Sequence, residues 1–127
     1  MTPALRDVHE LVLNNFKYKT DKSQYNKLEH WVEPDPSYNG TTPLVGDCED
    51  FALACRKLLR DRGIESVLIY CLDETGAGHL VLESNGFVLD NRQRSVVSVT
   101  WLLGRYTFLA VSGKDPGDPW REVLNGG

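Results

Sequence analysis

The sequence predicts a single-domain α+β fold, in which helices near the N-terminus are followed by antiparallel strands. Two stretches with apolar residues at helical spacing come first, and three short apolar segments separated by turn residues follow. The chain has 127 residues, the size of one domain, and 41% of them are hydrophobic, which suffices for one compact core. We therefore expect a single domain over residues 1–127.

The composition argues against several classes of protein. The net charge of −4 disfavours a general binder of nucleic acid or anionic membranes, because such proteins need an excess of Lys and Arg. No apolar run approaches the roughly 18 residues of a membrane span. The first residues, MTPALRDVHE, lack the basic-then-apolar order of a secretory signal. We therefore expect a cytoplasmic protein with no nucleic-acid or membrane partner.

The three cysteines are predicted to be free thiols. In a helix, Cys48 and Cys55 would lie about 10.5 Å apart along the axis, beyond the limit of about 7 Å for a disulfide. The sequence has no C-x-x-C pair, so no structural zinc site is predicted. Cys55 falls on the apolar face of a predicted helix and Cys71 within an apolar strand, so we expect both to be buried core residues.

The first helix is predicted over residues 3–16. Thr2 and Pro3 suit the N-cap and first helical positions, and apolar residues then recur at helical spacing. Residues 17–45 are polar, with scattered aromatic residues and turn formers, and indicate a long ordered loop. Loops of this length in compact domains are usually functional or disordered, and the aromatic residues favour a functional loop.

The second helix is predicted to begin at Cys48 and to stop at Gly63. Asp47 is a good N-cap residue and Asp50 follows it by three positions. Cys48 would then be the first helical residue, where the helix dipole and free N–H groups favour a thiolate. Its own backbone N–H could also point at a developing oxyanion.

The acidic neighbours of Cys48 act in the opposite direction. Asp47, Glu49 and Asp50 disfavour a further negative charge and raise the pKa of a nearby thiol. A cation must offset this effect if Cys48 is a nucleophile, and an imidazolium, a Lys or Arg, or a bound metal ion would serve. The alternative is that Cys48 is a small buried residue.

The segment after the second helix is predicted to form three strands. These cover residues 64–72, 78–84 and 87–91. Asn85 and Gly86 between the last two strands form the strongest short hairpin signal. The turn therefore fixes how these two strands pair.

A two-residue turn pairs Ser84 with Phe87, and the same register places His79 opposite Arg92. His79 and Asp90 are then diagonal neighbours on one face, within reach of a hydrogen bond. The other face carries apolar residues and is expected to be core: Leu80, Leu82, Phe87 and Leu89.

Cys48, His79 and Asp90 form a candidate triad of nucleophile, base and orienting carboxylate. The alternatives are a structural, hydrogen-bonded His79 and an Asp90 that only ends a strand. His9 is expected on the polar side of the first helix and His30 in the loop, and neither is predicted to be catalytic.

The motifs GDCEDFA, GHLVLES and FVLDNR, in this order, resemble the bacterial transglutaminase-like cysteine peptidases. This family includes a periplasmic protease that releases biofilm adhesins. Its Cys-His-Asp order matches Cys48, His79 and Asp90. Weaker similarities, FKYKTD and Trp31 upstream and RYTFLAVS and Trp120 downstream, extend the resemblance over most of the chain. The short chain suits a phage-encoded, virion-associated or intracellular variant.

The resemblance implies a papain-like cysteine peptidase fold in the transglutaminase arrangement, with N-terminal helices packed on an antiparallel β-sheet. It also implies that calcium binds beside the cysteine, since Asp47 and Glu49 occupy the matching positions. Calcium takes carboxylate oxygens and would offset their charge. The alternative is that Asp47 is only an N-cap and Glu49 only a favourable first-turn charge.

The expected activity is hydrolysis of a peptide bond in a protein or peptide substrate through a thioester. The backbone N–H of Cys48 and a side chain near residues 24–26 are expected to hold the oxyanion. Trp31 would either wall the cleft or belong to the core, and Arg92 would tune the site or be solvated. Alternatives are transglutaminase-like acyl transfer to an amine, and a silent binding or structural module such as a phage component.

Overall fold

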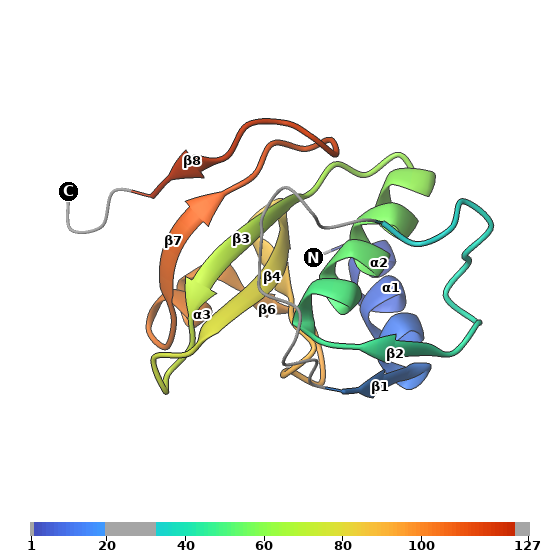
Figure 1. Ribbon diagram of the computed structural model, residues 1–127, viewed down its shortest axis with the longest axis horizontal. Coiled ribbons are helices and arrows are strands. Elements are labelled where there is room, and N and C mark those ends of the chain that lie inside the picture. The colour runs from blue at the N-terminus through green and yellow to red at the C-terminus, as the bar shows by residue number, and fades with distance from the viewer. Residues whose placement is uncertain (1, 20–32, 124–127) are drawn as a thin grey trace.

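The computed structural model describes residues 2–19 and 33–123 (Figure 1). Helices α1 and α2 pack together beside a six-stranded antiparallel sheet whose strand order is β6-β5-β4-β3-β7-β8, and β1 and β2 form a separate parallel pair (Figure 1). The elements are α1 (Pro3–Asn14), β1 (Phe16–Tyr18), β2 (Leu44–Gly46), α2 (Cys48–Asp61), β3 (Val67–Leu72), β4 (Gly78–Ser84), β5 (Phe87–Leu89), β6 (Val97–Ser98), α3 (Val99–Leu103), β7 (Thr107–Val111) and β8 (Arg121–Glu122).

Helix α1 begins at Pro3, as predicted, but ends two residues earlier than predicted, at Asn14. Asn15 closes the last turn, because its backbone N–H bonds to the carbonyl of Val12 and its side-chain amide donates to the carbonyl of Leu11. The chain then enters β1 at Phe16.

The predicted loop over residues 17–45 is partly strand. Phe16 of β1 pairs with Leu44 of β2, and the two three-residue strands run parallel. Strands this short carry too few residues for an alternating pattern to be recognised in sequence. The pairing of β1 with β2 bears on the site, because β2 leads directly into the N-terminus of α2.

The Asn85-Gly86 turn forms as predicted, with positive φ angles of 52° and 86°, as a type I′ hairpin requires. Ser84 pairs with Phe87 and Leu82 with Leu89, which confirms the predicted register.

The ladder is shorter than predicted at two ends. Strand β3 begins at Val67, because Ile64 is still hydrogen-bonded to Leu59 at the end of α2. Strand β5 ends at Leu89, because a turn with a bond from Gln93 N–H to the carbonyl of Asp90 takes over. The pairs between β4 and β5 run only from Leu82 to Ser84, so the predicted pairing of His79 with Arg92 is wrong. On the other side of β4, His79 pairs with Cys71 of β3.

The sheet is buried on both faces. Leu80, Leu82 and Leu89 pack with α1 and α2, as the sequence predicts for this face. The face that carries His79 is also core, because Val81 and Val88 lie with Leu102 of α3 in a second cluster. None of the described helices is long and apolar enough to span a membrane.

Candidate active site

A capping box fixes the start of α2. Asp47 Oδ1 accepts a hydrogen bond from the backbone N–H of Glu49 at 3.2 Å, and Asp50 Oδ2 accepts one from the N–H of Asp47 at 3.0 Å. The predicted N-cap is confirmed, and Cys48 is the first residue of the helix. Its backbone N–H is therefore one of the N-terminal groups that have no partner in the preceding turn of a helix.

The glycine before Asp47 makes room for this box. A Cβ atom at Gly46 would lie 2.1 Å from Asp50 Oδ2, and the obstruction continues along the Asp50 side chain. Any larger residue at position 46 must displace the carboxylate that caps the helix. The first five residues of the GDCEDFA motif thus form one local unit that places the thiol.

The thiol of Cys48 strongly prefers its protonated form. Burial, together with the charges of Asp47, Glu49 and Asp90, raises its pKa to about 12, although a hydrogen bond with the backbone of Leu80 acts the other way. Burial is the largest cause of this shift, and the three carboxylates add to it. A nucleophilic Cys48 needs a base that removes its proton.

His79 is the predicted candidate for that base. It lines a cavity of about 420 Å³ together with Cys48. Its Nε2–H donates to Asp90 Oδ1 at 2.7 Å, which is the hydrogen bond that the hairpin register predicts. Because Nε2 is bound to the carboxylate, Nδ1 is the ring nitrogen that can accept the thiol proton.

Asp90 is fully buried but remains ionised. Its Oδ1 also accepts the backbone N–H of Arg92 at 3.0 Å, and its Oδ2 accepts the hydroxyl of Tyr106 at 2.8 Å. Burial alone would raise the pKa of Asp90, but the hydrogen bond and charge of His79, and the bonds from Arg92 and Tyr106, hold it below the ordinary value. Sequence reasoning missed Tyr106.

His9 is also part of this region, contrary to the prediction that it lies on the polar side of the first helix. Its ring has no exposed surface, Nε2 lies 3.0 Å from the carbonyl oxygen of Asp90, and the ring packs edge-on against Phe51 of α2. Position 9 is four residues after Leu5, on the buried stripe of α1. The helical spacing of His9 thus indicates burial, and the prediction of an exposed position, which rested on the polarity of the side chain, is wrong.

The rest of the cavity wall comes from several elements: Tyr18, Asp73, Ala77, Gly78, Asn91 and Arg92. Arg92 forms ion pairs with Asp73, at 3.3 Å, and with Glu74, so it is held rather than freely solvated. The side-chain oxygen of Asn91 is buried and has no hydrogen-bond partner among the described residues. Cys55 and Cys71 are buried, as predicted.

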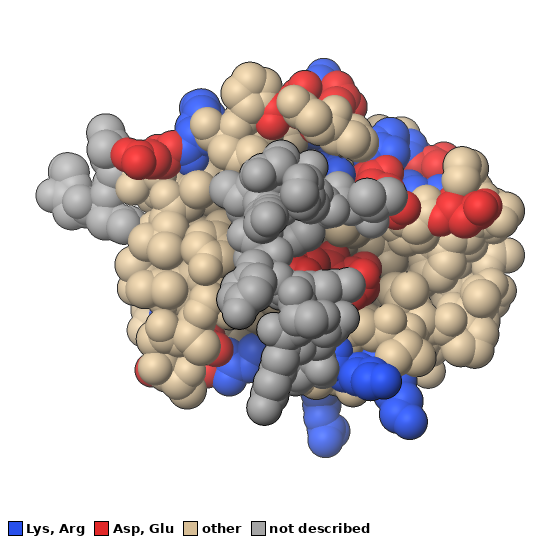
Figure 2. All heavy atoms as spheres, in the orientation of Figure 1, with Lys and Arg blue, Asp and Glu red and all other residues tan. Residues whose placement is uncertain are grey.

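The carboxylates beside Cys48 have a chemistry that suits calcium. Acidic side chains lie over the N-terminal part of α2 (Figure 2). Asp47 and the buried Glu49 supply the hard oxygen donors that calcium prefers. Asp47 uses Oδ1 for the helix cap, and a carboxylate can accept at both oxygens, so capping and cation binding are compatible. The described residues contain no cluster of three or more His, Cys, Asp or Glu that could hold a metal, so a calcium site here would need further ligands from elsewhere.

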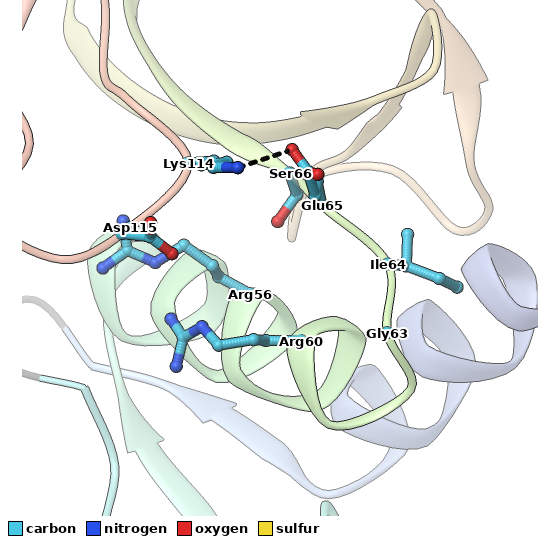
Figure 3. A pocket seen from close by; sticks show the side chains of 8 residues that line it. All are labelled: Arg56, Arg60, Gly63, Ile64, Glu65, Ser66, Lys114 and Asp115. Carbon is cyan, nitrogen blue, oxygen red and sulfur yellow. Dashed lines mark ion pairs between the residues drawn. The ribbon is translucent and has the colours of Figure 1, made fainter.

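A second pocket, of about 210 Å³, lies beside the later turns of α2 (Figure 3). It contains Arg56, Arg60 and Lys114, but each is paired. Glu33 accepts hydrogen bonds from both arginines, at 2.7 Å from Arg56 Nε, and Lys114 lies 3.6 Å from Glu65. The cations are thus compensated, and the cluster ties α2 to the segments around it.

Several predicted residues lie outside the described parts of the chain. These are Trp31, His30 and the segment 24–26, which is expected to supply a second oxyanion donor. Their predicted roles therefore stay predictions.

Comparison with known proteins bears on the fold and the family. The chain is similar to solved structures of LapG from Legionella pneumophila. The EGTA-treated form matches with a TM-score of 0.71 at 19% identity, covering 98% of this chain and 68% of that one. The calcium-bound form matches with a TM-score of 0.70 at 21% identity, covering 94% and 67%. These likenesses confirm the predicted α+β fold with a transglutaminase-like core.

The sequence itself decides the family. No curated protein matches it. The model of one family, described as bacterial transglutaminase-like cysteine proteinase, matches residues 1–126, nearly the whole chain. The chain belongs to the bacterial transglutaminase-like cysteine proteinases.

Proposed function

We propose that this cysteine proteinase cleaves its protein or peptide substrate with Cys48 as nucleophile, His79 as general base and Asp90 as the carboxylate that orients the base. The observation that carries the proposal is the cavity shared by Cys48 and His79, together with the 2.7 Å bond that fixes His79 to Asp90. Sulfur, imidazole and carboxylate then act in series.

In the first step, Nδ1 of His79 takes the thiol proton while Sγ attacks the substrate carbonyl carbon. The high pKa of the Cys48 thiol favours proton transfer together with attack over a preformed thiolate. The tetrahedral intermediate collapses to a thioester, and the amine leaves with the proton from His79. Water then attacks the thioester, the carboxylic acid departs, and the thiol is restored.

The oxyanion of each tetrahedral intermediate needs hydrogen-bond donors. The backbone N–H of Cys48 at the start of α2 is one such group. We propose a second donor from residues 24–26. Replacing Gln24 with Ala should then lower kcat and leave KM nearly unchanged.

Peptide-library cleavage tests the proposal directly. Cys48→Ala should lose cleavage by more than about 1000-fold, and Asp90→Asn should lose less, because the oriented base is weakened but present. Cys55→Ala is the matched control, because it makes the same change on the same helix away from the cavity. Cleavage by Cys48→Ala at the wild-type rate would refute the proposal.

Thiol alkylation gives a second test that needs no substrate. Cys55 and Cys71 are buried, so accessibility alone makes Cys48 react faster with iodoacetamide. The informative comparison is therefore between wild type and His79→Gln at Cys48. Slower alkylation of the variant near neutral pH, with equal rates at high pH, supports a base at position 79, whereas equal rates throughout contradict it.

The same cavity could pass the acyl group to an amine. A labelled amine added to the cleavage reaction distinguishes the two outcomes. We expect free acid as the main product, and incorporation of the amine into the product would instead identify a transferase.

We also propose that Asp47 and Glu49 help to hold calcium. The calcium-bound form of LapG supports this for a protein of the same fold. When bound, calcium would offset the negative charge that raises the pKa of the Cys48 thiol.

A further inference from the structure

Tyr106 links two groups of the candidate site. Its hydroxyl lies 2.8 Å from Asp90 Oδ2 and 3.1 Å from Arg92 Nη1. The residue follows α3, is 3% exposed, and does not line the cavity that contains Cys48. Its contact with the carboxylate therefore lies outside the wall of that cavity.

The direction of these two hydrogen bonds is fixed by chemistry. A guanidinium can only donate and an ionised carboxylate can only accept. The single hydroxyl proton of Tyr106 must therefore point at Asp90, while its oxygen accepts from Arg92. Arg92 is held in turn by Asp73 and Glu74. The result is a one-way chain from Arg92 through Tyr106 to Asp90.

With these hydrogen bonds, both oxygens of the Asp90 carboxylate have donors. Asp90 Oδ1 is bound by His79 and by the backbone N–H of Arg92, and Oδ2 by Tyr106. Without the hydroxyl, Oδ2 would be a buried oxygen that has lost its donor, and the carboxylate could rotate to seek another. The Tyr106 ring also packs edge-on against His79, with centroids 5.7 Å apart, and limits tilting of the imidazole.

We propose that Tyr106 is a positioning residue that locks the Asp90 carboxylate, and through it the His79 imidazole, in the orientation needed for proton transfer from Cys48. The proposal rests on the function proposed above. Tyr106 acts through Asp90 and does not contact the substrate.

Tyr106→Phe is the test variant, because it keeps the ring and removes only the hydroxyl. Tyr38→Phe is the matched control: Tyr38 is also buried, and its hydroxyl has no partner among the described residues. Unfolding midpoints in urea should show that both variants fold.

The first measurement is proton NMR of the Nε2-bound hydrogen of His79, assigned by its loss in His79→Gln. We expect this resonance to shift in Tyr106→Phe and its exchange with water to accelerate about tenfold, the factor that corresponds to about one hydrogen bond. Tyr38→Phe should leave both unchanged. An unaltered resonance and exchange rate in Tyr106→Phe overturns the proposal.

The second measurement is cleavage of a peptide selected from the library. We expect kcat to fall about tenfold in Tyr106→Phe with KM unchanged. In an Asp90→Asn background the same change should have no further effect, because the group through which Tyr106 acts has already been altered. An equal loss in both backgrounds would show a role independent of Asp90 and overturn the proposal.

The two measurements distinguish failure of the proposed peptidase function from failure of the positioning role. If wild type cleaves no peptide, the proposed function fails, while an NMR response of Tyr106→Phe still supports the positioning role. If wild type cleaves and Tyr106→Phe matches it in both measurements, the positioning role fails and the peptidase function stands.

Discussion

The imidazole of His9 and the main chain of Asp90 are joined by a buried hydrogen bond of 3.0 Å across 81 positions of sequence. His9 Nε2 donates to the carbonyl oxygen, and Nδ1 has no partner among the described residues. Helix α1 thereby holds the backbone at the residue whose side chain orients His79. The N-terminal helix is thus part of the support of the site.

His9→Phe should reduce stability. The substitution keeps an aromatic ring against Phe51 but removes the donor to Asp90, whose carbonyl retains a bond from the N–H of Gln93. We expect the free energy of unfolding to fall by about 1–2 kcal/mol, measured by urea denaturation near pH 7.5. Glu10→Gln, on the exposed neighbouring position, is the control. An unchanged free energy of unfolding in His9→Phe would mean that the hydrogen bond from His9 to Asp90 makes no net contribution to stability.

The same residue should make stability depend on pH. Burial lowers the pKa of His9 below its ordinary value of 6.5, against the opposing effects of Asp90 and Glu10. Below pH 6.5 the unfolded chain therefore binds a proton that the folded chain does not. Its stabilising contribution is present above pH 6.5 and is lost as pH falls towards the folded pKa. Urea midpoints from about pH 7.5 to pH 5 should fall more steeply in wild type than in His9→Phe. Parallel curves would contradict this assignment.

Gly46→Ala should destabilise the protein through Asp50. The new Cβ would occupy the place of the carboxylate that caps α2, so we expect a loss of about 1–2 kcal/mol in urea denaturation. In an Asp50→Ala background, where the obstructing carboxylate is absent, Gly46→Ala should cost much less. Equal losses in both backgrounds would place the cause in the backbone of residue 46.

Calcium should raise the melting temperature of wild type if Asp47 and Glu49 contribute to a calcium site. Asp47→Asn separates the two roles of this residue, because Asn is also a good N-cap but brings no charge. This variant should match wild type in EGTA and respond less to calcium. A wild-type melting temperature that calcium does not change would leave Asp47 with the capping role alone.

Local signals explain what the sequence predicted well. The start of helix α2 is determined by the capping residues Asp47 and Asp50, and the register of the hairpin by the turn residues Asn85 and Gly86. These features depend on bonds between residues close in sequence. The hydrogen bond between His79 and Asp90 followed from that register, so the carboxylate and the imidazole could be paired without coordinates.

Long-range contacts explain what the sequence did not reveal. Strands β1 and β2 are stabilised by each other across a long connection, and neither is distinctive alone. Tyr106 reaches Asp90 from beyond α3, and nothing near it in sequence separates it from an ordinary core tyrosine. His9 was misjudged because a polar side chain suggested exposure, although its helical position lies on the buried stripe.

The two-residue turn at Asn85 and Gly86 sets the register of β4 and β5. The register in turn determines that His79 and Asp90 lie on the same face of the sheet and within hydrogen-bond distance. Because side chains alternate along a strand, inserting one residue there would turn Asp90 to the opposite side of the sheet and break the pair. The connection between β3 and β4, by contrast, can be lengthened without altering that alternation. Natural or engineered length variation in active relatives should therefore accumulate at the β3–β4 tip and avoid the Asn-Gly corner.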